Sequence, residues 1–376
     1  MVPLLGWQFE TLLAGLLVVV MAATLLLWPR VVGPRVLRGA QRVGMVLVCQ
    51  VAAVLLVGAA VNNYGYFYGT WSDLFGTGSQ QVVAAPQWPQ GHFGRTMVVP
   101  AVTVAKPTPW SPASAATVRG KVESLRIHGA RSGLTEDALI YLPPQYFQPA
   151  YAHHQFPAVE MLTGYPGVTA SLVSRLHVPE LYLAELTHHR AAPMVVVMLR
   201  PTVAPPRDTE CTDVPAGPQA LTYLSQDVPT AVDGLLRVRP LDWGAMGEST
   251  GGYCAVKEAM LHSDVFRAAV SLSGYYHTLE DPTTGNLWGG SQVLRNLNSP
   301  EWLLAHQPAP PVSVLASIGQ AEGGLGGFSD LRRFLSLVRP PMTASSIIVP
   351  GGGHNYANWA RVLPTGFDWL SARLHA

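Results

Sequence analysis

The chain has 376 residues, of which 12% are charged and 48% are apolar, whereas an average soluble domain carries roughly 25% charged residues. Because 24 basic and 23 acidic residues leave a net charge of +1, no overall field draws the protein to nucleic acid, and nucleic-acid binding is excluded. The apolar excess also excludes a disordered chain and argues against a fully soluble one.

Two uncharged stretches near the N-terminus, residues 11–28 and 43–61, have nearly the length needed to cross about 30 Å of hydrocarbon. Both are predicted to be transmembrane helices, which makes the lipid bilayer an expected partner. A cleaved signal peptide is the alternative for the first stretch. That alternative is disfavoured because residues 1–10 carry no positive charge, whereas a signal peptide has a basic start.

The short connection between the two stretches is basic, with no acidic residue. Its arginines are Arg30, Arg35, Arg38 and Arg42. The positive-inside rule keeps such a loop in the cytoplasm, so we expect residues 1–75 to form a two-pass membrane anchor and the remainder to be extracytoplasmic. Residues 76–120 are rich in Pro, Gly, Ala, Ser and Gln without sustained periodicity, which indicates a linker to a catalytic domain at 121–376.

Beyond the linker, apolar segments of strand length alternate with helical segments. The expected strands are residues 122–128, 138–142, 158–163, 194–199, 243–246, 268–272, 312–318 and 345–349. The expected helices are residues 170–180, 219–236, 252–261, 329–337 and 357–374. Since several strands are apolar on both faces, the pattern predicts an open, mostly parallel α/β sheet whose ligand site lies at the carboxyl ends of its strands.

A candidate nucleophile stands at one of these strand ends, where the sequence reads Gly247-Glu248-Ser249-Thr250-Gly251. This G-x-S-x-G pattern between a strand and a helix is typical of a nucleophile elbow, in which the small Gly247 and Gly251 let the strand and helix approach each other. The turn would expose the Ser249 hydroxyl and aim the amide N–H of Thr250 at a developing oxyanion.

A serine hydroxyl needs a base, which in turn is oriented by an acid, in the chain order Ser, acid, His. His354 is the expected base because it follows the last strand directly, after three glycines that let the loop bend over the elbow. Glu322, after the strand at 312–318, is the expected acid. Asp330 is the alternative acid, although it also suits the start of an ordinary helix.

Further expectations concern the oxyanion hole, the cysteines and metals. The second oxyanion donor should come from the loop after the third strand, and since Pro166 has no N–H, Tyr165 is the candidate. Cys211 and Cys254 are the only cysteines in the external part and are expected to form a disulfide, the alternative being two unrelated buried thiols. No H-E-x-x-H motif and no glycine-rich phosphate loop is present, so neither a metal nor a nucleotide cofactor is expected.

Four segments together resemble a known family. They are the strand and Tyr141-Leu142-Pro143-Pro144 within residues 124–147, the loop Leu162-Thr163-Gly164-Tyr165-Pro166-Gly167, the serine elbow, and the tail Gly353-His354-Asn355-Tyr356-Ala357-Asn358-Trp359. They resemble the putative esterase family of the α/β-hydrolase superfamily, which includes esterase D and the antigen 85 mycolyltransferases of actinobacteria. The resemblance covers residues 121–374 and implies an α/β-hydrolase fold, with Ser249 as nucleophile, His354 as base and Glu322 as orienting acid.

The expected function is therefore that of a membrane-anchored, extracytoplasmic serine esterase that acts on an ester or acyl-lipid substrate through an acyl-enzyme. An acyltransferase that moves acyl chains between cell-envelope glycolipids is the first alternative, because the same triad serves both reactions. A non-catalytic binding module on the same scaffold is the second alternative. The presence of both Ser249 and His354 in the required order argues against that module.

Overall fold

The computed structural model describes residues 2–75, 82–85, 97–99, 116–324 and 326–374. The chain divides into two compact units. The first consists of Met1–Ser79 together with two short segments from later in the chain, Gln320–Glu322 and Gly351–Asn355, and the second contains the rest. The expected anchor at residues 1–75 therefore shares its unit with the two segments that carry Glu322 and His354.

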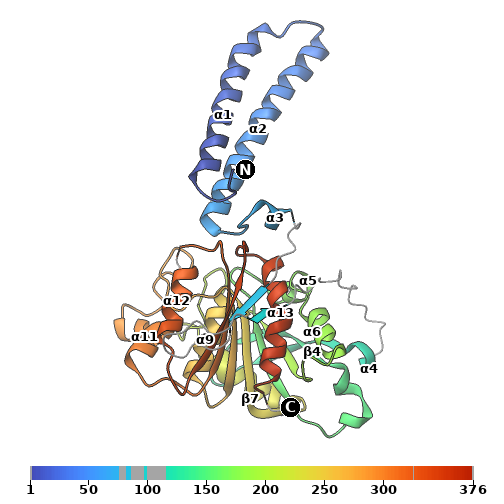
Figure 1. Ribbon diagram of the computed structural model, residues 1–376, viewed down its shortest axis with the longest axis vertical. Helices are drawn as coiled ribbons and strands as arrows, with labels where there is room; N and C mark the ends of the chain where they lie inside the picture. The colour runs from blue at the N-terminus through green and yellow to red at the C-terminus, as the bar shows by residue number, and fades with distance from the viewer. Residues whose placement is uncertain (1, 76–81, 86–96, 100–115, 325, 375–376) are drawn as a thin grey trace. The chain divides into compact units, whose positions relative to one another are not determined.

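The first unit contains two long apolar helices, α1 (Trp7–Leu27) and α2 (Arg35–Gly65), which lie side by side as an antiparallel pair (Figure 1). A short helix, α3 (Trp71–Leu74), follows them. Each long helix is apolar enough and long enough to cross a membrane, and each contains one of the two predicted spans. Large apolar side chains point outward, such as Leu25 and Val54, which are 74% and 70% exposed. Exposed apolar side chains of this kind are compatible with membrane anchoring.

The second unit is built on one mixed sheet with the strand order β2-β1-β10-β9-β8-β7-β5-β6-β4-β3. The strands are β1 (Val82–Ala85), β2 (Met97–Val99), β3 (Lys121–His128), β4 (Thr135–Leu142), β5 (Phe156–Leu162), β6 (Val195–Leu199), β7 (Val238–Glu248), β8 (Phe266–Leu272), β9 (Ser313–Gly319) and β10 (Thr343–Val349). The adjacent strands β10, β9, β8, β7, β5 and β6 are parallel to one another. The outer strands β4 and β3 on one side, and β1 and β2 on the other, pair antiparallel.

Helices connect the strands. They are α4 (Ala116–Arg119), α5 (Thr169–Ser174), α6 (Val178–Thr187), α7 (Ala220–Thr222), α8 (Val228–Leu235), α9 (Thr250–Leu261), α10 (Gln292–Leu297), α11 (Pro300–His306), α12 (Phe328–Leu337) and α13 (Tyr356–Ser371). A π-helical turn, Tyr223–Asp227, joins α7 to α8. Short 3-10 turns lie at Trp28–Arg30, Pro144–Phe147 and Pro149–Tyr151.

The core explains why β5 is apolar at every position except Glu160. Every residue of this central strand is buried, and side chains alternate between the two faces of the sheet. Val159 and Met161 pack in the layer formed with α5, α6 and α13, while Ala158 and Leu162 pack in the layer formed with α8, α9 and α12. Because helices cover both faces (Figure 1), a parallel strand here has no solvent side and needs no polar alternation.

All eight expected strands are present, and the predicted mostly parallel α/β sheet of the α/β-hydrolase type is confirmed. The single helix predicted at 170–180 is wrong, because α5 ends at Ser174 and α6 begins at Val178. Between them His177 has a left-handed backbone with φ 55°, which breaks the helix. The short helices α10 and α11 had no predicted counterpart.

Two strands fall within the range 76–120 that we expected to be a linker. β1 pairs antiparallel with β10, and β2 pairs with β1, so these two strands extend the sheet at its β10 side. The remaining residues of that range up to 115 lie outside the described residues. Within the described part, the range therefore contributes two strands to the sheet of the second unit.

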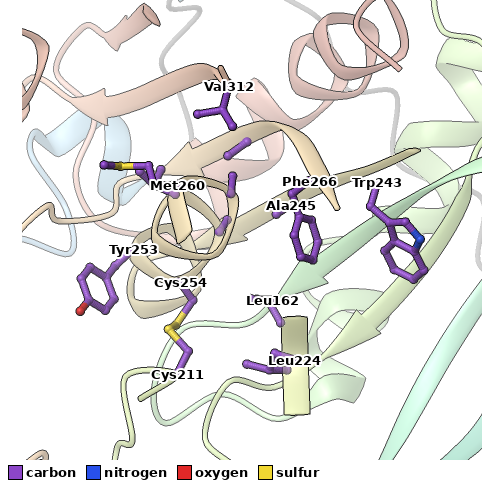
Figure 2. Packing of buried hydrophobic residues seen from close by; sticks show 14 of the residues in the cluster. Leu162, Cys211, Leu224, Trp243, Ala245, Tyr253, Cys254, Met260, Phe266 and Val312 are labelled. Carbon is purple, nitrogen blue, oxygen red and sulfur yellow. A yellow bond between two sulfur atoms is a disulfide. The ribbon is translucent and has the colours of Figure 1, made fainter. Parts of the chain in front are cut away.

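The expected disulfide between Cys211 and Cys254 is confirmed, and the alternative of two separate thiols is wrong. Both residues are fully buried, and the bond ties the loop after β6 to α9, next to Tyr253 (Figure 2). The Glu258 carboxylate lies within 4.8 Å of both sulfur atoms. Since the two sulfurs are bonded to each other, neither is a thiolate that could bind a metal ion.

Replacing both bonded cysteines with alanine is expected to lower the free energy of unfolding by about 4 kcal/mol, because a bond between residues 43 positions apart restricts the unfolded chain. Urea unfolding of the detergent-solubilised protein, followed by tryptophan fluorescence, measures this loss. Cys49→Ala is the matched control, since Cys49 is the free cysteine. Equal unfolding midpoints for the double variant and the control would contradict the prediction.

Candidate active site

Ser249 lies on a sharp turn between a strand and a helix. β7 ends at Glu248 and α9 begins at Thr250, so Ser249 is the one residue between them. Its backbone has φ 53° and ψ −121°, a conformation that L-residues rarely adopt. The turn is held by hydrogen bonds in which Ser249 N donates to Leu272 O and Tyr253 N donates to Ser249 O. This is the geometry expected of a nucleophile elbow.

The two glycines that flank the turn have no room for a side chain. A Cβ atom added to Gly247 would lie 2.3 Å from the carbonyl carbon of Gly251, and one added to Gly251 would lie 2.4 Å from the carbonyl oxygen of Leu162. Any larger residue at either position would force the strand and the helix apart. The structure thus accounts for both glycines of the G-x-S-x-G pattern.

The loop after β5 passes close to Ser249. A Cβ atom added to Gly164 would lie 2.9 Å from Ser249 Cβ, so the backbone of this loop reaches the elbow itself. Tyr165 is the next residue, and its hydroxyl donates a hydrogen bond to Pro206 O at 2.8 Å. On the other side, Thr250 opens α9, and its hydroxyl donates to Asp208 Oδ2 at 3.2 Å. The two residues expected to supply oxyanion donors therefore both lie beside Ser249.

Glu248, directly before Ser249, is a residue whose environment the sequence did not reveal. It is 1% exposed, and its Oε1 accepts a hydrogen bond from Gly164 N at 3.3 Å. Burial raises its pKa to about 8, against the ordinary value of 4.5. The carboxyl is therefore mostly neutral at pH 7, and a full negative charge is kept away from the elbow.

This raised pKa makes stability depend on pH. Between about pH 4.5 and pH 8 the unfolded chain releases a proton from Glu248 that the folded chain retains, so the free energy of unfolding should fall as the pH rises through this window. In Glu248→Gln, whose amide oxygen can still accept from Gly164 N, the fall should be smaller. Urea unfolding at pH 5 and pH 8 measures it.

Glu123→Gln is the matched control, because this glutamate pairs with Lys121 at the surface and is 41% exposed. It should retain the pH dependence of the wild type. If Glu248→Gln loses as much stability between pH 5 and pH 8 as the control does, the carboxyl at position 248 is not the group that titrates.

His354 and Glu322 are joined directly. Glu322 lies three residues after β9, and His354 lies five residues after β10. His354 Nδ1 and Glu322 Oε2 are 2.7 Å apart. The Glu322 side chain is only 4% exposed and that of His354 25% exposed, so solvent screens this pair weakly. A buried carboxylate on Nδ1 holds the imidazole in one orientation and one tautomer.

Asp330, the alternative acid, belongs to a different pair. Its Oδ1 lies 2.8 Å from His277 Nδ1, and its Oδ2 accepts from Tyr276 N at 3.0 Å. The structure thus brings Glu322, and not Asp330, to His354. The hydrogen bond to Asp330 raises the pKa of His277. This second His–Asp pair lines a cavity of about 660 Å³ whose lining includes none of residues 247–251.

Ser249, Glu322 and His354 are far apart in sequence, but each comes after a strand that ends at the same edge of the sheet. β7, β9 and β10 run parallel within the order β10-β9-β8-β7, so their carboxyl ends lie at one edge of the sheet. Ser249 follows β7, Glu322 follows β9 and His354 follows β10. Ligand sites of open α/β sheets form at this edge.

Solved structures share this fold. A ferulic acid esterase has a TM-score of 0.55 at 14% identity, covering 68% of this chain and 98% of its own. An S-formylglutathione hydrolase from Agrobacterium tumefaciens has a TM-score of 0.56 at 14% identity, covering 67% and 95%. FphF, a fluorophosphonate-binding serine hydrolase of Staphylococcus aureus, has a TM-score of 0.52 at 16% identity, covering 67% and 98%. At such identities the likeness establishes the fold. No curated protein matches the chain in sequence.

The sequence also matches a family model. The model described as "Putative esterase" matches residues 135–370, which is more than half of the chain. The matched range begins with β4 and ends within α13, so it includes the elbow at Ser249 and the loop that carries His354. The chain belongs to the Putative esterase family, and it is an esterase with the α/β-hydrolase fold.

Proposed function

We propose that this esterase is a membrane-anchored serine hydrolase in which Ser249 is the nucleophile, His354 the general base and Glu322 the acid that orients it. The observation that carries the proposal is the 2.7 Å contact between His354 Nδ1 and Glu322 Oε2. It is supported by the strained backbone of Ser249 at a strand end of the same sheet edge. Nucleophile, base and acid also follow one another in the chain order typical of the fold.

In the proposed reaction, Ser249 Oγ attacks the carbonyl carbon of the ester. Because Nδ1 of His354 is held by Glu322, the proton from Ser249 passes to Nε2. The tetrahedral intermediate collapses when His354 Nε2 returns this proton to the alcohol oxygen, and the acyl group stays on Ser249. Water then attacks the acyl-enzyme with His354 as base, which releases the acid and restores the hydroxyl.

The amide N–H groups of Thr250 and Tyr165 are proposed to donate to the oxyanion. Thr250 is the first residue of α9, and the first N–H groups of a helix have no partner within it and carry partial positive charge. The loop of Tyr165 is brought to the elbow through Gly164. The raised pKa of Glu248 supports this assignment, because a neutral carboxyl does not oppose the positive field of these amides.

The anchor and the location belong to the same proposal. α1 and α2 cross the membrane, Arg30 between them and the three arginines at the start of α2 stay on the cytoplasmic side, and the hydrolase lies outside. The buried disulfide supports this orientation, since such bonds persist in oxidising compartments. The substrate class is an acyl ester that is presented near the membrane surface, because the anchor keeps the enzyme there.

A fluorophosphonate coupled to a charged dye, which cannot cross the membrane, tests the proposal on intact cells that express the full chain. We expect labelling of the intact cells, mapped by peptide mass spectrometry to Ser249. Labelling that occurs only after cell lysis would reject the extracytoplasmic location, but it would still agree with the proposed serine chemistry. A folded protein that hydrolyses esters but carries the label on another residue would reject Ser249 as the nucleophile.

A further inference from the structure

The chain directly after α2 is hydrogen-bonded to the loop that carries His354. Three consecutive residues of that loop donate to it: Gly353 N to Asp73 Oδ2 at 3.2 Å, His354 N to Tyr66 O at 2.7 Å, and Asn355 Nδ2 to Phe67 O. Asn355 Nδ2 also donates to Asp73 Oδ2 at 3.3 Å. We call residues 66–73 the collar. All these residues belong to the first unit.

The fit between the collar and the loop leaves no room for side chains. A Cβ atom on Gly353 would lie 2.5 Å from Tyr66 O and 2.7 Å from Phe67 O, and one on Gly69 would lie 2.4 Å from Gly351 O. Real Cβ atoms essentially never make such contacts with backbone atoms. Glycine is therefore required on both sides of the contact, which indicates a specific fit between the collar and the loop.

The collar is held in shape by Asn62 of α2 and by two of its own side chains. Asn62, in the last turn of α2, accepts from Tyr68 N at 2.8 Å and donates to Tyr68 O at 3.1 Å. Asp73 Oδ2 accepts from Gly69 N at 2.9 Å, while Thr70 Oγ1 accepts from Asp73 N at 3.1 Å and caps α3. The same carboxylate oxygen therefore closes the collar and binds the histidine loop.

We propose that the collar positions the catalytic histidine and that Asp73 is its principal positioning residue. This inference rests on the proposed role of His354. A loop with three successive glycines, 351–353, has many accessible backbone conformations, and fixing it costs conformational entropy. Asp73, Tyr66 and Phe67 supply the acceptors that select one conformation. A displacement of about 1 Å at a catalytic group can cost about 100-fold in rate. The end of the second membrane helix is therefore part of what makes the hydrolase active.

Asp73→Ala, in the full chain in detergent, is expected to lower kcat for a soluble p-nitrophenyl ester by about 10- to 100-fold, with KM within about twofold. Asp73→Asn keeps an acceptor oxygen and should recover most of the activity. Asp137→Ala is the matched control, since this surface aspartate pairs with Arg126 and is 66% exposed. Hydrogen exchange should show faster exchange of the amides at 353–355 in Asp73→Ala only.

The inference is overturned if Asp73→Ala retains the kcat of Asp137→Ala, or if Asp73→Asn is as impaired as Asp73→Ala. It is also overturned if the loss of kcat is accompanied by unfolding of the whole protein, seen as faster exchange throughout the chain. If the wild type is active and labelled at Ser249 and Asp73→Ala has the same kcat, only the proposed role of the collar is rejected. A wild-type protein without labelling at Ser249 rejects the proposed function, and the collar's role falls with it.

Discussion

Ser249→Ala is expected to lower kcat for ester hydrolysis by about 10³- to 10⁶-fold, because the acyl-enzyme can no longer form. The residual rate would come from the oxyanion donors and substrate binding alone. Labelling by a fluorophosphonate should be lost completely. Stopped assays with a p-nitrophenyl ester measure the first effect, and in-gel fluorescence measures the second.

The stability of this variant should change little, since alanine removes a hydroxyl and leaves the backbone turn in place. Ser174→Ala is the matched control, because Ser174 is exposed and its hydroxyl donates only to Ala170 O within α5 in the contacts described. It should keep full activity and labelling. A Ser249→Ala protein that is folded and still hydrolyses the ester at the rate of the control would remove Ser249 from the mechanism.

Glu322→Gln should lower kcat by about 10²- to 10⁴-fold. A glutamine can present its NH₂ group to Nδ1 of His354, which favours the tautomer that carries the proton on Nε2 and so cannot accept one from Ser249. The amide also lacks the charge that stabilises the imidazolium in the transition state.

Asp330→Asn is a close control for this variant. Both acids contact Nδ1 of a histidine, at 2.7 Å for Glu322 and 2.8 Å for Asp330, but Asp330 contacts His277. We expect Asp330→Asn to lose less than about tenfold in kcat. The opposite ranking, with Asp330→Asn the more impaired variant, would make Asp330 the catalytic acid and require the loop around it to rearrange in the enzyme at work.

Much of the fold could be predicted because its signals are local. A central parallel strand such as β6 is buried on both faces and therefore reads as an uninterrupted apolar segment. The elbow is local too, since Gly247, Ser249 and Gly251 act on one another within a single turn. The prediction of one helix at 170–180 missed a local signal in Pro179. Proline favours the first turn of a helix, so Pro179 marks the start of α6 rather than the interior of a longer helix.

The parts that could not be predicted depend on contacts between distant residues. Glu322 and Asp330 both follow β9, and only the course of the loop between them decides which one reaches His354. The buried Glu248 carboxyl accepts its hydrogen bond from Gly164 N, which is 84 residues away. The contact between Asp73 and Gly353 spans 280 residues and leaves no periodic pattern in either segment.

The disulfide has a practical consequence for experiments on this protein. With Cys211 and Cys254 bonded to each other inside the core, Cys49 in α2 is the one free thiol among the three cysteines of the chain. The natural sequence therefore accepts a single spin label or fluorophore in its second long helix without any mutation. Measurements of depth in a bilayer can start from the unmodified chain.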